Sequence, residues 1–458
     1  MAIIHQPDLF CWEHVDAASD LDRLRMLLEA LPDEDLMRAL ETERKGRRDD
    51  YPLRALWNTV LAGIVFQHEG IESLRRELQR NAQLRQVCGL DVFRGASAVP
   101  PEWVYTRFLR KLFRHQAEID RMLDALVDRL EQLLPGLGRR LAVDSKAIAS
   151  HGKPLRKGVD ATEPDGRRDR DADWGTKTYK GVREDGTAWE KTQRWFGYKL
   201  HLVVDADYEL PLGYAVTKAS AGDSPHLLPL VEALEARHPE LAERSEYLSA
   251  DKAYDSQENN QNLWDDYAIR PLIDIRATWK EEPERPRSLY PGRVDTIFHT
   301  EQGEVLCRCR DGATTERDNY APMAYEGFEE ERMTLKYRCP AKAHAIACTQ
   351  QDLCNEGRQP AHGRIVRVPL DTNRRVFTPL ARDSKAWTRE YKHRTAVERV
   401  NSRLDVSFGF ERHYIRGMNK MKARAGLALL VMLGMALGWI RAGQRERIRS
   451  LVGRPRAA

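Results

Sequence analysis

The chain has 458 residues, 41% of them hydrophobic and 31% charged, a balance that excludes a disordered or membrane-embedded protein and leaves room for two or three domains. The formal net charge is only +4, but residues 389–458 hold 16 Lys and Arg against 5 Asp and Glu. This basic end favours a polyanionic partner, and nucleic acid is the first candidate.

We expect no secretory signal, because the first residues lack a basic segment followed by an apolar run. The strongest apolar run, residues 427–440, is shorter than the roughly 20 residues that cross a bilayer, and predicts a buried helix. Five of the seven cysteines gather between positions 307 and 354, which is not the spacing of a disulfide framework. These features predict a cytoplasmic protein with no membrane partner.

Residues 1–137 are expected to form an all-helical N-terminal domain, because apolar positions recur three or four apart between turns. The helical segments are residues 21–31, 33–43, 52–67, 71–80, 102–115 and 117–134. Arg107, Arg110 and Lys111 lie on one of these helices at helical spacing. They form either a nucleic-acid contact or an ordinary solvated face.

After residue 137 the apolar pattern changes to that of strands. Residues 140–144 are a short apolar strand ending on Asp144, residues 152–194 are an exposed loop, and residues 197–217 are a hairpin. A capped helix then precedes a second short strand, which ends on Asp251, and a further helix and strand follow to residue 275. Three antiparallel strands followed by strand-helix-strand units predict an α/β core with an RNase-H-like mixed sheet and flanking helices, its first part at residues 138–275.

Residues 276–382 break this rhythm with eight prolines and short β-like pieces, and we expect a β-rich or irregular insertion. Its cysteines suggest two readings. Four thiolates could hold a structural Zn²⁺, yet the spacings lack the paired two-residue knuckles of strong zinc motifs, so the cysteines could equally be reduced and unliganded. The ligands of such a zinc ion would be Cys339, Cys348 and Cys354, with Cys307 or Cys309 as the fourth.

Residues 383–442 return to the core, and residues 443–458 form a basic tail. Here Tyr391, Arg394 and Glu398 fall on one face of a predicted helix, while apolar residues line the neighbouring side. A phenol, a guanidinium and a carboxylate pointing the same way suit a phosphate beside a metal ion. The alternative is a solvated helix with charge pairs four residues apart.

Asp144 and Asp251 both end short apolar strands, and neighbouring strand ends can bring such carboxylates close together. Glu398 would join them from a helix packed alongside. Three oxygen ligands on rigid elements suit Mg²⁺ or Mn²⁺. Two such ions would serve an in-line displacement at phosphorus.

Several further motifs accompany these residues. They are Tyr-Pro-Leu-Arg-Ala-Leu at 51–56, Leu-Ala-Val-Asp-Ser at 141–145, Gly-Tyr-Lys-Leu-His at 197–201, Leu-Gly-Tyr-Ala-Val at 212–216 and Ala-Asp-Lys-Ala-Tyr-Asp-Ser at 250–256. With the spaced Tyr391, Arg394 and Glu398, the chain resembles DDE-type transposases of bacterial insertion sequences over nearly its whole length.

The resemblance implies that Asp144, Asp251 and Glu398 hold two Mg²⁺ or Mn²⁺ ions. Water would cut the DNA at a transposon end, and the freed 3′-hydroxyl would attack target DNA. Tyr391 and Arg394 would hold phosphates, with Lys252 as a further contact. The family pattern expects a lysine seven residues after the glutamate, where this chain has Asp405. Arg403 is the candidate to replace that lysine.

The implied partner is double-stranded DNA, both the terminal inverted repeats and the target, bound by a homodimer in the nucleoid of a bacterial cell. Two other hypotheses remain open. One is an RNase-H-like nuclease that cuts without strand transfer, and the other is a domesticated protein that binds DNA without cutting it.

Overall fold

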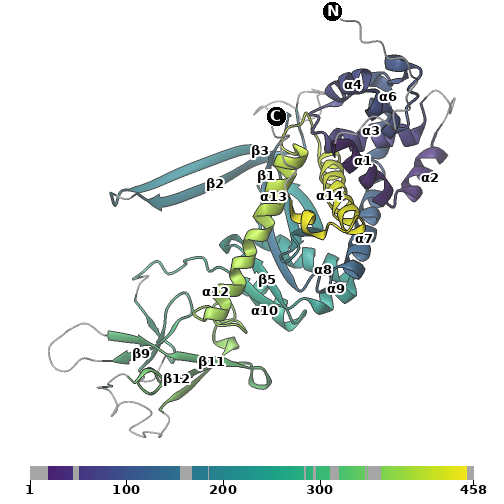
Figure 1. Ribbon diagram of the computed structural model, residues 1–458. Coiled ribbons are helices and arrows are strands. Elements are labelled where there is room, and N and C mark those ends of the chain that lie inside the picture. Colours follow the sequence, from purple (N-terminus) through teal and green to yellow (C-terminus); the bar gives the residue numbers. More distant parts are fainter. Residues whose placement is uncertain are drawn as a thin grey trace, which may run out of the picture.

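The computed structural model describes residues 19–44, 51–154, 168–183, 185–282, 285–291, 296–309, 319–345, 348 and 363–450. Its centre is one mixed sheet of six strands (Figure 1). Five of them form the core in the order β4 (Leu210–Lys218), β3 (Ala188–Asp205), β1 (Arg140–Ala149), β5 (Tyr247–Ala250) and β6 (Arg270–Ile273), and the sixth, β2 (Asp173–Val182), also pairs with β3. β3 is antiparallel to β1 and β4, whereas β5 and β6 run parallel to β1. This is the RNase-H-like order predicted from the sequence.

The apolar runs form strands because both faces of the sheet are covered by helices. Leu141, Ala142 and Val143 of β1 are fully buried. Two helices cover the face to which Lys146 of β1 points. α13 (Thr395–Phe408) packs on β1 and β3, and α14 (Met418–Arg441) packs on β4. On the other face, His201 of β3 contacts His226 at the start of α8 (Leu227–Arg237), with ring centroids 4.7 Å apart.

The structure describes seven N-terminal helices, the six that were predicted and α5, which was not predicted. They are α1 (Ser19–Ala30), α2 (Glu34–Thr42), α3 (Leu53–Val65), α4 (Ile71–Arg80), α5 (Ala82–Cys88), α6 (Glu102–Leu112) and α7 (Gln116–Leu133). α1, α3 and α7 pack against α14. Two glycines let α14 approach α1 closely, because an added Cβ would lie 2.5 Å from Leu27 at Gly434 and 2.3 Å from Met26 at Gly438. By length and composition α14 could cross a membrane, but 83% of its most apolar window is buried inside the protein. It is the buried helix expected from the apolar run.

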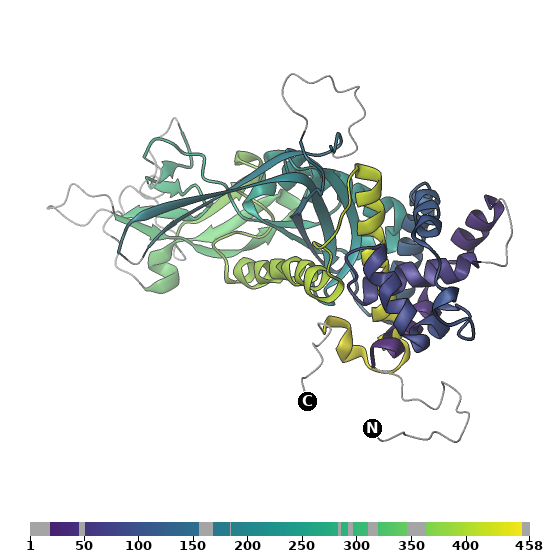
Figure 2. The same ribbon diagram turned by 90° about the horizontal axis from the view of Figure 1, so that it is seen from above.

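One segment differs from its prediction. Instead of a loop up to residue 194, β2 (Asp173–Val182) pairs with the first half of β3 and forms a two-stranded ribbon that projects from the core, away from the N-terminal helices (Figures 1 and 2). Threonines and aromatic residues that favour strands alternate with Gly, Lys and Arg here, and the polar residues concealed the pattern. Residues 155–167 of the expected loop lie outside the described part of the chain.

The insertion is β-rich, as expected. It contains one sheet of β7 (Arg287–Ser288), β8 (Ile297–His299), β9 (Val305–Cys309) and β10 (Asn319–Pro322), and a second of β11 (Ala324–Glu329), β12 (Thr334–Arg338) and β13 (Ile365–Pro369). The two sheets share a small apolar core of their own that includes Ile297, Leu335, Tyr337 and Phe377.

The chain returns to the main sheet through α12 (Lys385–Tyr391), a 3-10 turn at Lys392–Arg394, and α13. The sequence predicted one unbroken helix across this region. Ser384 caps α12 by accepting a hydrogen bond from the Trp387 amide at 3.1 Å, and α13 ends at Gly409 with φ of 58°. Glu398 therefore lies in the first turn of α13, next to the break.

Candidate active site

The parallel pairing of β1 and β5 brings two aspartates together. Val143 is opposite Ala250 in the register, so Asp144 and Asp251 follow side by side at the same edge of the sheet. β1 continues past Asp144 to Ala149, whereas β5 ends directly before Asp251. The sequence had placed both residues at strand ends.

The Asp144 carboxylate is half-buried and accepts a hydrogen bond from the Ser145 amide at 2.7 Å. Burial and, to a smaller extent, the negative charge of Asp251 raise its pKa to about 6, while the Ser145 amide, Lys177 and Arg394 oppose the shift. The pair thus carries more negative charge than its surroundings neutralise. This is a suitable environment for a divalent cation.

Asp251 is held by the turn that follows it. Its Oδ1 atom accepts a hydrogen bond from the Ala253 amide at 2.8 Å, which caps the 3-10 turn Lys252–Tyr254. Lys252 is exposed on this turn beside Asp251, where the sequence placed it as a DNA contact.

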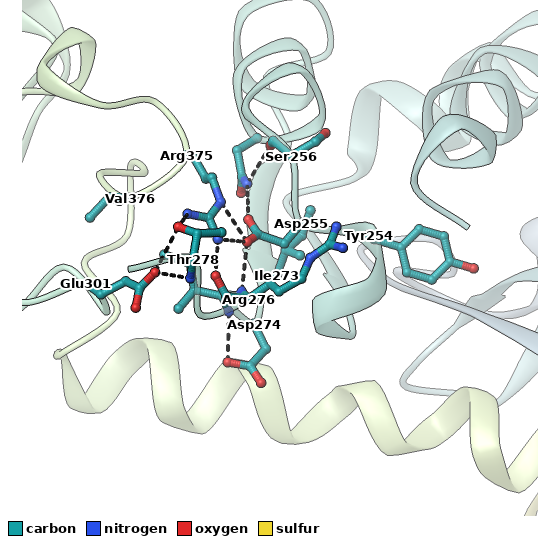
Figure 3. A network of polar contacts seen from close by, with 12 residues as sticks. Tyr254, Asp255, Ser256, Ile273, Asp274, Arg276, Thr278, Glu301, Arg375 and Val376 are labelled. Carbon is teal, nitrogen blue, oxygen red and sulfur yellow. Dashed lines mark hydrogen bonds and ion pairs between the residues drawn. The ribbon is translucent and has the colours of Figure 1, made fainter. Parts of the chain in front are cut away.

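A polar network fixes the far end of the same turn to the insertion (Figure 3). Asp255 has a fully buried side chain, and its Oδ2 atom accepts hydrogen bonds from Arg375 Nε and from the Arg276 amide, both at 2.8 Å. Arg375 Nη1 donates a hydrogen bond to Thr278 Oγ1 at 3.3 Å. The amide and the hydroxyl of Thr278 donate hydrogen bonds to Glu301. Residues more than 100 positions apart thus hold the loop that carries Asp251.

Glu398 is placed differently from the two aspartates. Its side chain is 51% exposed, and its Oε1 atom forms an ion pair with Arg394 Nη2 at 2.8 Å. The charge of Arg394 also acts on Asp144, so this guanidinium interacts with both Glu398 and the aspartate pair. Within the described residues, no three Asp, Glu, His or Cys side chains gather closely enough to hold a metal ion. The structure brings two of the predicted ligands together and links the third through Arg394.

Tyr391 lies beside this group. Its ring stacks on Trp387 with centroids 4.5 Å apart, and Arg394 lies 5.9 Å from the Tyr391 centroid. Burial raises the pKa of Tyr391 to about 12, and the nearby Asp274 adds to the shift. Trp387 is a part of the site that the sequence analysis missed, and its spacing of four residues from Tyr391 was the available signal.

Lys146 is a second residue that was missed. It follows Asp144 by two positions on β1, so both side chains leave the same face of the strand. Lys146 Nζ contacts Asp405 Oδ2 at 2.6 Å and Glu411 Oε1 at 2.7 Å. Burial opposes the charge of Lys146, but these two carboxylates leave its pKa raised. The position where the family pattern expects a lysine is therefore occupied by a carboxylate that binds a lysine from β1.

Arg403 does not face this group. It is 4% exposed, donates a hydrogen bond to the Ile448 carbonyl at 2.8 Å and contacts Glu209. Burial lowers its pKa to about 10. Its guanidinium ties α13 to β4 and to the C-terminal segment, so Arg403 does not take the place of the expected lysine.

The three cations of α6 lie apart from the aspartates, on the helical N-terminal domain. Arg107 and Arg110 are exposed, and Arg107 lies 5.7 Å from the ring centroid of Trp103, itself 57% exposed. Lys111 donates a hydrogen bond to the Glu43 carbonyl at 2.9 Å. Lys111 thus has a structural partner, and the two arginines remain available on the surface.

The zinc hypothesis gains no support. Cys307 is buried in β9, and Cys339 and Cys348 are half-buried. Among the residues that the structure describes, these cysteines belong to no group of three metal-binding side chains. Cys354 lies outside the described residues.

The mixed sheet and the aspartate pair define an RNase-H-like protein of the nuclease and transposase class. A family model described as the transposase DDE domain matches residues 135–433, which is more than half of the chain. The chain therefore belongs to the transposase DDE domain family.

Among solved structures, the chain is similar to a piggyBac transposase synaptic complex with hairpin DNA, determined by cryo-EM. The identity is 10% and the TM-score 0.37, over 96% of this chain and 80% of that chain. A comparison with curated proteins gives no match.

Proposed function

We propose that this transposase cuts DNA at transposon ends and joins the freed 3′-hydroxyl to target DNA, with divalent cations held by Asp144, Asp251 and Glu398. The observation that carries the proposal is the aspartate pair. Two carboxylates lie at one edge of a rigid sheet, and their mutual repulsion, together with burial, raises the pKa of Asp144. A protein maintains such a costly arrangement when a cation compensates it.

The residues present fit Mg²⁺ or Mn²⁺, because carboxylate oxygens are the ligands that these ions prefer. When bound, such ions activate the attacking oxygen and neutralise charge on the leaving oxygen. Asp144 and Asp251 are held by β1 and by the capped turn after β5. Glu398 reaches the same ions once Arg394 releases it.

Arg394 has a second role in this proposal. Its guanidinium now neutralises Glu398 and lies near Asp144. A DNA phosphate offers two charged oxygens that accept a bidentate pair of hydrogen bonds, as a carboxylate does, and can take the place of Glu398 on the guanidinium. Tyr391, stacked on Trp387, would donate its hydroxyl to that phosphate. DNA binding would thereby free Glu398 for the cations.

The partner in this proposal is duplex DNA, both at the transposon end and at the target. The basic C-terminal segment and exposed Lys252 supply charge for its phosphates. Joining two ends in one event needs two active sites, so we propose a homodimer on DNA.

The test is incubation of the protein with a labelled duplex transposon end, a plasmid target and Mg²⁺ or Mn²⁺. The proposal predicts cleavage at the end and label joined to the plasmid, both lost in EDTA. Cleavage without joining would support the nuclease hypothesis. Binding without cleavage in either metal would support the domesticated DNA-binding protein.

A further inference from the structure

The β2–β3 ribbon has two chemically different faces. Paired residues of an antiparallel ribbon lie on the same face, and successive residues alternate between faces. Lys177 is opposite Gln193, and Tyr179 is opposite Lys191, so these four side chains share one face. The Lys177 ammonium lies 5.6 Å from the Tyr179 ring centroid, which agrees with this assignment.

Two tryptophans complete this face. A Cβ atom added at Gly181 would overlap the Trp189 ring, and one at Gly175 would overlap the Trp195 ring, so each indole lies across a glycine of the opposite strand. We name the cationic face by its six side chains, Lys177, Tyr179, Trp189, Lys191, Gln193 and Trp195. These six side chains contain two ammonium groups and three aromatic rings. The one carboxylate on the same face is that of Asp173, at the base of the ribbon opposite Gly197, and it accepts hydrogen bonds from Ser220.

The opposite face has no excess of positive charge among its described side chains. Thr178 and Thr192 lie across from each other with their hydroxyl oxygens 3.4 Å apart, and the Trp174 and Phe196 rings are in contact. Glu190 and Arg194 are its charged residues whose side chains the structure describes, and they carry opposite charges. Lys180 is paired with Glu190 in the register of the ribbon. We name this the threonine face.

The cationic face begins at the active site. Lys177 is close enough for its charge to act on the Asp144 carboxyl. From Lys177 to its end at Val182, β2 extends about 20 Å at the rise of a strand, which is more than half a turn of duplex DNA. Tyr179 and Trp189 are 40% and 38% exposed along this path.

We propose that the cationic face of the β2–β3 ribbon binds the DNA duplex next to the phosphodiester at Asp144 and Asp251. The proposal rests on the proposed function, because it places the DNA by the site of cleavage. A two-stranded ribbon fits the major groove, ammonium groups bind phosphates, and exposed aromatic rings contact sugars and bases. Beyond Asp173 at its base, which Ser220 binds, this face carries only positive charge, and this favours a polyanion over a second copy of this chain, which is nearly neutral overall.

The two faces of the ribbon can be compared by replacing one cation on each face of the same strand. Lys191 and Arg194 are both exposed cations of β3, three positions apart and on opposite faces. The salt dependence of binding to a 30-base-pair duplex of mixed sequence is measured for wild type, Lys191→Gln and Arg194→Gln. Loss of one phosphate contact lowers the slope of log K against log salt by about 0.9. We expect this loss, with severalfold weaker binding, in Lys191→Gln and no change in Arg194→Gln.

The outcomes separate this proposal from the proposed function. If wild type does not bind the duplex, the proposed function fails and the ribbon proposal falls with it. If wild type binds but Lys191→Gln keeps its slope, or both variants lose equally, the ribbon proposal alone is refuted.

A photo-crosslinker distinguishes the partner of the ribbon. p-Benzoylphenylalanine in place of Tyr179 should crosslink to the labelled duplex, and in place of Trp174, on the threonine face, it should not. A crosslink from position 179 to a second protein chain would identify the ribbon as a subunit arm and overturn the proposal.

Discussion

At the scale of single residues, the candidate active site is defined by two aspartate carboxylates of like charge that lie close together. Asp144 and Asp251 follow paired positions of β1 and β5, and burial together with this repulsion keeps the pKa of Asp144 raised. An aspartate whose pKa is raised in the folded state lowers stability once it ionises. The ionised aspartate pair therefore lowers the stability of the metal-free folded protein.

Replacement of Asp144 by Asn should stabilise the metal-free protein. The pKa of Asp144 rises from 3.8 to about 6, which corresponds to at most about 3 kcal/mol. The unfolded aspartate ionises near pH 4 and the folded one near pH 6, so the cost grows across this window and is complete above it. In EDTA, the variant should have a higher melting temperature than wild type at pH 8. The difference between the two melting temperatures should become smaller towards pH 4.

The control for this prediction is Asp22→Asn, which removes a carboxylate that is 59% exposed on α1. It should leave the melting temperature almost unchanged at both pH values. An Asp144→Asn protein less stable than wild type at pH 8 would show that no repulsion exists at the pair.

Arg394 should contribute a phosphate contact that its neighbour Arg399 does not. Both form ion pairs, Arg394 with Glu398 at 2.8 Å and Arg399 with Glu209 at 2.6 Å. Arg394→Ala should weaken duplex binding and lower the salt slope by about 0.9, since one phosphate contact is lost. Arg399→Ala should keep the wild-type slope. Equal slopes for all three proteins would remove Arg394 from the DNA interface.

Sequence patterns identified those site residues whose positions follow from the residues next to them in the sequence. Tyr391, Arg394 and Glu398 share a helical spacing, and each aspartate stands at the end of an apolar run. The ion pair of Lys146 with Asp405 joins positions 259 apart, so no spacing could reveal it. The burial of Arg403 also depends on elements far away in the sequence, and its exposure could not be predicted.

At the scale of elements, α13 must hold Glu398 at a fixed distance from β1. Lys146 lies between them, 11% exposed, and Asp405 of α13 is 25% exposed. Asp405 is seven residues from Glu398, which is two helical turns along the same face. Their ion pair therefore attaches the helix that carries Glu398 to the strand that carries Asp144.

Lys146→Met should destabilise the protein, because it leaves the carboxylates of Asp405 and Glu411 without their cation. A cost of about 2 kcal/mol is expected for a partly buried pair. Lys146→Met with Asp405→Leu should recover more than half of the loss, since the uncompensated buried charge is gone. The measurement is the urea unfolding midpoint. A double variant no more stable than Lys146→Met would mean that the pair does not join the two elements.

The order of the main strands was predictable because each is a short apolar run with its own turn signals. The ribbon was not, because its strands carry Lys, Thr and Gly at alternating positions and stabilise each other by pairing rather than by burial. The 3-10 turn at Lys392–Arg394 was also missed, because it interrupts a segment without Pro or Gly.

At the scale of the whole molecule, the insertion reaches back to support the active site. Arg375 follows the last strand of the insertion, and it binds Asp255, four residues after Asp251. Sequence composition predicted the insertion and its β character. It could not predict this attachment, which depends on contacts between the chain before the insertion and the chain after it.

Arg375→Met should loosen the Asp251 turn. It leaves the fully buried Asp255 carboxylate without its cation, a change that typically costs about 3 to 5 kcal/mol. Hydrogen exchange should rise in residues 251–256 and 273–278 and stay constant in the N-terminal helices. Arg367→Met is the matched control, because that arginine pairs with Glu329 at the surface of the same insertion. Unchanged exchange at residues 251–256 would refute this support role.

The central claim is that Asp144, Asp251 and Glu398 share divalent cations when DNA is bound. Fe²⁺ in place of Mg²⁺ generates hydroxyl radicals that cut the chain beside the bound ion. In the presence of the duplex transposon end, cuts are predicted beside all three residues, suppressed by excess Mg²⁺ and absent in Asp144→Asn. Cuts that avoid these positions, or that persist unchanged in Asp144→Asn, would contradict the shared site.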